Sequence, residues 1–141
     1  MIMPYINFDG DCEEAFLWYA KIFNGNIEHL SKYGDIPENP DLPMSDEQKR
    51  KVMHAQLMLT ETGGISGADA VWPIEKGGAI SIHAHLANEA LAQKVFLALS
   101  EGGTILGELV ANPPPDDSGI SGGVKDKYGI SWIISALKDT L

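Results

Sequence analysis

The chain has 141 residues, 44% of them hydrophobic, and its 20 acidic and 10 basic residues give a formal net charge of −10. This charge repels nucleic acids and anionic lipid surfaces, so neither is expected as a partner. The single cysteine excludes a disulfide scaffold, and no segment reaches the roughly 18 apolar residues of a membrane span, so we expect one compact cytoplasmic domain.

The first half predicts a strand, a helix and three further strands. The helix follows the strand Pro4–Phe8, with Asp11 as N-cap, Glu14 at capping-box spacing and Gly25 as its stop. Alternating apolar residues then predict strands at 26–33, 51–60 and 64–68, with a helical turn starting at Ser45.

The second half repeats this order after VWPIEKGG, where proline and paired glycines interrupt both periodicities. A strand at 79–86 precedes a helix that is capped by Asn88 and ends at Gly102 and Gly103, and strands follow at 104–110, 121–125 and 130–136. The tripeptide GIS at 64–66 recurs at 129–131, at the last strand of each half. We predict a single domain of two βαβββ modules, at about 1–69 and 79–141, joined by linker 70–78.

Five segments resemble, in their order along the chain, the signature segments of PhnB-like proteins. They are NFDGDCEEAFLWYAKIF, YGDIP, KVMHAQL, ALSEGGT and KDKYGISWII. PhnB-like proteins, some described as 3-demethylubiquinone methyltransferase-like, belong to the vicinal oxygen chelate superfamily of glyoxalases, dioxygenases and bleomycin-type resistance proteins. The resemblance implies an α+β glyoxalase/bleomycin resistance fold, with paired βαβββ modules forming a curved mixed sheet around a concave cavity, and a homodimer.

The resemblance also implies where a metal ion would bind. Metal-dependent members take one ligand, usually histidine or glutamate, from the first and last strand of each module. Here these positions fall on Met3 (Pro4 or Tyr5 if the register slips), Ala68, Ser81 and Ile133. Methionine, alanine and isoleucine lack the nitrogen or oxygen donors that divalent ions require. We therefore expect neither a metal ion nor another cofactor at these positions.

Strand alternation predicts which side chains line the cavity. Residues two apart in a strand share one face, and the apolar face must pack against the helix. The polar face then carries Tyr5, Asn7, His54, Gln56, Ser81, His83 and His85. Three interpretations remain: a wet groove without chemical function, a site that orients a small ligand, or a relocated metal site that uses His54 with His83 or His85.

These observations favour a homodimer that binds a small organic molecule, with no catalytic residue assigned. One alternative is a metal-dependent lyase, isomerase or dioxygenase with His54, His83 and His85 as ligands; another is a structural or partner-binding homodimer. Cys12 is interpreted as a buried small hydrophobe rather than a nucleophile. Trp132 is expected to pack beneath a helix.

Overall fold

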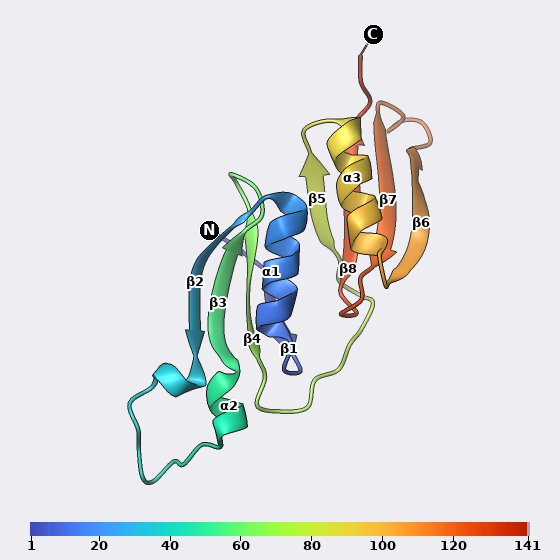
Figure 1. Cartoon of the computed structure of the whole chain (residues 1–141). Helices are drawn as coiled ribbons and strands as arrows, with labels where there is room; N and C mark the ends of the chain where they lie inside the picture. The colour runs from blue at the N-terminus through green and yellow to red at the C-terminus, as the bar shows by residue number, and fades with distance from the viewer. Residues whose placement is uncertain (141) are drawn as a thin grey trace. The chain divides into compact units, whose positions relative to one another are not determined.

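The computed structural model describes residues 1–140, which fall into two compact units. The N-terminal unit spans Met1–Glu75 and the C-terminal unit begins at Lys76. Both units have the predicted order of strand, helix and three strands (Figure 1). The N-terminal unit contains β1 (Tyr5–Phe8), α1 (Cys12–Phe23), β2 (Asn26–Lys32), a 3-10 turn (Tyr33–Asp35), α2 (Asp46–Arg50), β3 (Val52–Met58) and β4 (Gly64–Asp69). The C-terminal unit contains β5 (Ile82–Leu86), α3 (Glu89–Ser100), β6 (Thr104–Ala111), β7 (Gly119–Lys125) and β8 (Ser131–Leu137).

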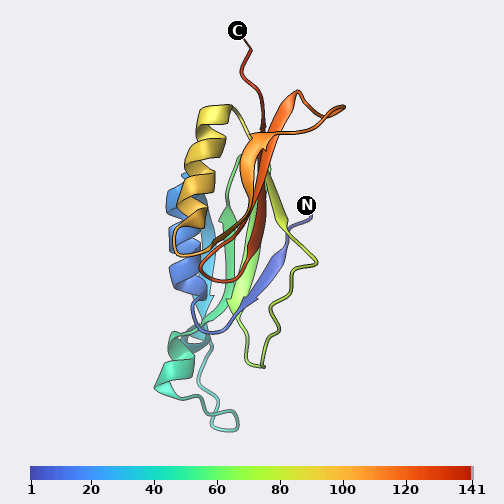
Figure 2. The same cartoon turned by 90° about the vertical axis from the view of Figure 1, so that its right-hand side faces the viewer.

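Each unit folds as one mixed four-stranded sheet with a long helix on one side. The strand orders are β1-β4-β3-β2 and β5-β8-β7-β6, and in each sheet the first pair is parallel while the others are antiparallel. Figure 2 shows α1 and α3 each on one side of its own sheet. The predicted α+β class with two βαβββ units is confirmed.

The core of the N-terminal unit lies between α1 and its sheet. In β1, Ile6 and Phe8 are buried while Tyr5 is 51% exposed, as strand alternation predicts. On the helix, Phe16 and Tyr19 are fully buried, and the Phe16 ring meets Phe8 edge to face with centroids 5.9 Å apart. Apolar burial of this kind supplies most of the free energy of folding.

The start of α1 differs from the prediction. Asp11 is the N-cap residue, but its side chain accepts no capping hydrogen bond, so the predicted capping box with Glu14 is wrong. The backbone N–H of Cys12 donates instead to Asp69 Oδ1, at 3.0 Å. A carboxylate far away in sequence therefore caps the helix, which local spacing does not reveal.

The end of α1 also differs. The left-handed residue is Asn24, with φ 54°, rather than Gly25. Glycine is needed at position 25 for another reason, because a Cβ atom there would lie 2.4 Å from the carbonyl oxygen of Met58 on β3. Gly25 permits the close approach of two chain segments.

The predicted elements of the C-terminal unit are largely confirmed. Asn88 caps α3 by accepting a hydrogen bond from Leu91 N at 2.8 Å, and the apolar residues at helical spacing, Ala92, Val95, Phe96 and Leu99, are buried. Trp132 is fully buried in the same core. The first strand is shorter than predicted, because β5 begins at Ile82 and leaves Ser81 just before it. Within residues 1–140, no helix has the length and apolar character that a membrane crossing requires.

Candidate functional site

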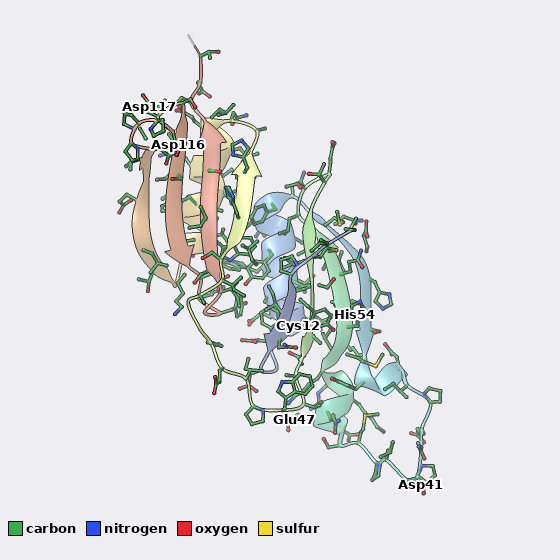
Figure 3. All side chains as sticks on the ribbon, turned by 180° about the vertical axis from the view of Figure 1, so that it is seen from behind. Cys12, Asp41, Glu47, His54, Asp116 and Asp117 are labelled. Atoms are coloured by element: carbon green, nitrogen blue, oxygen red, sulfur yellow. The ribbon has the colours of Figure 1, made fainter. Side chains whose placement is uncertain are left out.

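Each sheet has one face that points away from the helix of its own unit, called here the helix-free face. In the N-terminal unit, Tyr5 and Asn7 alternate with buried Ile6 and Phe8, which places the first two on the helix-free face. On β3, alternation places His54 and Gln56 opposite the buried side chains of Ala55 and Leu57. Figure 3 shows His54 on β3, seen from the side opposite α1.

Tyr5 and His54 contact each other on this face. The Tyr5 hydroxyl lies 3.1 Å from His54 Nδ1, and the two rings stack with an interplanar angle of 19° and centroids 5.7 Å apart. Burial is the main cause that raises the pKa of the Tyr5 hydroxyl, and electrostatic interactions with Cys12 and Tyr33 raise it further. A raised pKa keeps this hydroxyl protonated and able to donate a hydrogen bond to the imidazole.

Two residues of β2 join this face without having been predicted. His29 lies beside His54, with ring centroids 5.6 Å apart, and Gln56 Nε2 donates to Glu28 Oε2 at 3.0 Å. The pairing of β2 with β3 is irregular between Ile27 and His29, so one extra residue interrupts the alternation. The bulge explains why alternation alone missed Glu28 and His29.

The C-terminal unit carries a second polar group, called here the His–Ser–His cluster, made of His83, Ser135 and His85. Ser135 Oγ lies 2.7 Å from His83 Nε2 and 2.8 Å from His85 Nδ1. The two imidazole rings meet edge to face with centroids 6.4 Å apart. Ser135 is 8% exposed, whereas both histidines are exposed.

Strand pairing brings Ser135 into this cluster. In the parallel pair of β5 and β8, His85 is the register partner of Ser135 and His83 that of Ile133. Residues two apart share a strand face, so Ser135 lies on the same face as Ile133. The sequence does not give the register of β5 with β8, and without it Ser135 cannot be placed beside the histidines. Ser81 precedes β5 and is exposed; among the described contacts, no side-chain hydrogen bond joins it to the cluster.

Two of the positions at which the resemblance implies metal ligands, Ala68 and Ile133, lie next to predicted cavity residues. Ala68 is the register partner of Asn7, and Ile133 that of His83, so both positions lie within the two sheets. Neither side chain offers a donor atom. Within each unit, moreover, residues 1–140 contain no group of three histidine, cysteine or acidic side chains placed to hold one ion.

Two cavities of the N-terminal unit are lined by residues other than those predicted for the ligand cavity. One of about 580 Å³ and one of about 550 Å³ share Asp9, which precedes α1, and Glu47 and Lys51, in and just after α2. Neither is lined by any of the seven side chains predicted for the cavity. Glu47 marks this region in Figure 3, at the end of the unit that carries α2.

Cys12 is expected to resist modification. Its side chain is fully buried, and burial, with the negative charges of Asp69, Asp11 and Glu13, raises its pKa far above the ordinary range. The folded state therefore disfavours the thiolate form of Cys12. Because the thiol of the unfolded chain ionises with a pKa of about 8.5, the free energy of unfolding falls as the pH rises above that value. At about pH 8, a disulfide reagent should modify native Cys12 at least ~100-fold more slowly than in concentrated urea. Equal rates would contradict the burial of the thiol.

Comparison with known proteins identifies similar sequences and structures. Residues 1–135 match the family model described as 3-demethylubiquinone-9 3-methyltransferase. Protein PA1353 from Pseudomonas aeruginosa is 29% identical, with a TM-score of 0.83 over 99% of this chain and 98% of that one. The putative 3-demethylubiquinone-9 3-methyltransferase, PhnB protein, from Bacillus cereus is 25% identical, with a TM-score of 0.69 over 98% of each chain.

A more distant structure shares the fold alone. FosX, a fosfomycin resistance protein from Listeria monocytogenes described in complex with Mn(II) and sulfate, is 11% identical, with a TM-score of 0.58 over 100% of this chain and 93% of that one. No curated protein sequence matches the chain.

Proposed function

The chain belongs to the family described as 3-demethylubiquinone-9 3-methyltransferase, and we propose that it is a small-molecule-binding protein. Its relatives confirm the resemblance to PhnB-like proteins of the vicinal oxygen chelate superfamily. The proposal uses the fold of this family and not the methyl transfer in its description, because a fold does not fix a function.

The single observation that carries the proposal is the His–Ser–His cluster on the helix-free face of the C-terminal sheet. Two imidazole rings from β5 converge there on the hydroxyl oxygen of Ser135 from β8, at 2.7 and 2.8 Å. Convergent polar groups beside apolar side chains are typical of ligand sites. Tyr5, His54 and Gln56 form a comparable polar set in the N-terminal unit.

The proposed ligand is bound without a metal ion. Ala68 and Ile133 replace the donors that a vicinal oxygen chelate centre would use. The rival function, a metal-dependent lyase, isomerase or dioxygenase with His54, His83 and His85 as ligands, makes the opposite prediction. We further propose a single domain of two modules that pairs as a homodimer, to be tested by light scattering of the purified protein at micromolar concentration.

Metal analysis and thermal shift separate these functions. We expect the purified protein to contain far less than one transition-metal ion per chain, and Mn²⁺, Zn²⁺ or Ni²⁺ to leave its melting temperature unchanged. A screen of small organic molecules should contain compounds that raise the melting temperature, as ligands of the native state do. His83→Ala should weaken their effect, whereas Asp41→Ala, at an exposed loop residue, should not.

Two results would contradict the proposal. A stoichiometric ion that is lost in His83→Ala would establish the metal-dependent alternative. A protein that binds neither ions nor any small molecule, but elutes with another protein, would favour the structural or partner-binding role.

A further inference from the structure

We propose that the His–Ser–His cluster is a hydrogen-bond relay, in which one ring donates to Ser135 and the other accepts from it, and that it selects a ligand with a neutral hydroxyl group on an apolar body. The inference rests on the proposed small-molecule function and adds the chemical class of the ligand. It is carried by the two short hydrogen bonds of Ser135 and by the number of hydrogens available to them.

The serine hydroxyl has one hydrogen and can accept two hydrogen bonds. Ser135 is buried, and its described hydrogen bonds go only to the two rings. If both rings donated, the hydroxyl hydrogen would be buried without an acceptor, which costs free energy. Both rings cannot accept, because only one hydrogen is present. One ring therefore donates to Ser135 and the other accepts from it.

This arrangement fixes the role of the second nitrogen in each ring when both rings are neutral. His83 bonds to Ser135 through Nε2 and His85 through Nδ1, which leaves His83 Nδ1 and His85 Nε2 as the second nitrogens. If His83 accepts, both rings carry their hydrogen on Nδ1; if it donates, both carry it on Nε2. In either case one of the second nitrogens donates and the other accepts.

A pair of one donor and one acceptor discriminates between ligands. A hydroxyl group suits either nitrogen, because it both donates and accepts. A carboxylate suits only the donor, because it has no hydrogen to give to the other nitrogen. A hydrocarbon satisfies neither. The cluster thus favours alcohols, phenols and enols.

The surroundings of the cluster are apolar. Ile133 and Leu137 lie two residues to either side of Ser135 on β8, and they are 37% and 60% exposed. Across the sheet, the Cβ of Leu106 and the Cδ1 of Ile133 lie 3.7 and 3.6 Å from the position that a Cβ of Gly123 would take. Gly123 adds no side chain between these two apolar groups, and we expect the body of an apolar ligand to rest against the exposed side chains of Ile133 and Leu137.

The relay makes a prediction that requires no ligand. Long-range ¹H–¹⁵N spectra at about pH 8 should show His83 and His85 in the same tautomer, with the hydrogen on Nδ1 in both or on Nε2 in both. Ser135→Ala should remove this match. The readout is the tautomer population of each ring, which Ser135→Ala should change, because the shared hydroxyl no longer holds the rings. The control Ser131→Ala, a buried serine on the same face of β8, should leave these populations unchanged. Opposite tautomers in the wild-type protein would overturn the relay.

Binding of three matched compounds tests the ligand class. At about pH 8, 2-naphthol should bind at least about tenfold more tightly than 2-methylnaphthalene or 2-naphthoate, which corresponds to one hydrogen bond. Ser135→Ala should reduce this preference to about threefold or less, and Ser131→Ala should not. Equal binding of all three compounds would overturn the ligand class while leaving small-molecule binding intact. Binding of none would contradict both.

Discussion

Asp126→Ala is expected to lower the free energy of unfolding by about 4 kcal/mol, because one buried carboxylate satisfies three donors at once. Asp126 is 3% exposed, and its Oδ1 accepts from the backbone N–H groups of Tyr128 and Ile130 at 2.8 and 3.1 Å. Its Oδ2 accepts from Trp132 Nε1 at 2.8 Å. Urea denaturation followed by circular dichroism measures the loss.

Two further variants show whether the hydrogen bonds are responsible. Asp116→Ala, in the exposed loop between β6 and β7 that Figure 3 labels, should change stability by no more than about 0.5 kcal/mol. Trp132→Phe should cost less than Asp126→Ala, and the double variant should cost clearly less than the sum of the two, because the residues share one hydrogen bond. Strict additivity would show that the indole and the carboxylate act independently.

Gly64→Ala should destabilise the N-terminal unit by about 3 kcal/mol. A Cβ atom at this position would lie 2.1 Å from the carbonyl oxygen of Leu57 and 2.9 Å from the Cα of Met58. Both atoms belong to the backbone of β3, the neighbour of β4 in the sheet. The steric clash with an added Cβ can therefore be removed only if the two strands move apart. Thermal unfolding of the variant measures the cost.

Gly107→Ala is the matched control, because a Cβ there meets no atom within 4 Å. An added methyl group in this open position should leave stability unchanged or raise it by about 0.5 kcal/mol, through the lower entropy of the unfolded chain. Equal melting temperatures for the Gly64 and Gly107 variants would contradict the close approach of β3 and β4.

The sequence predicts the elements well wherever a periodic pattern decides the outcome. The alternation in β1 and β5 identifies their two faces, and the helical spacing of α3 identifies the buried side of that helix. Both patterns involve residues that are close in sequence, and burial of the apolar side chains stabilises the elements that these patterns predict.

Most of the features that the sequence does not reveal depend on residues far apart in the chain. Asp69 and Asp126 are buried, although aspartate is normally a surface residue. Asp69 accepts hydrogen bonds from the backbone N–H groups of Cys12 and Val52, which only the folded chain brings near. The donors to Asp126 lie two to six residues further along the chain, and the turn before β8 brings them near it. Ser135 joins the histidines through the register of β5 with β8, and Glu28 joins Gln56 through a bulge. Neither register nor bulge has a signal in local spacing.

The alternation of the strands has an evolutionary consequence. Alternate positions of one strand are under different selection. One set of side chains packs in the core beneath the helix, and the other set lies on the helix-free face. Mutations can therefore accumulate on the second set at little thermodynamic cost. The two halves of this chain share one architecture yet carry a tyrosine–histidine stack in one and a serine between two histidines in the other. A duplicated ancestor could diverge in chemistry twice without losing its shape.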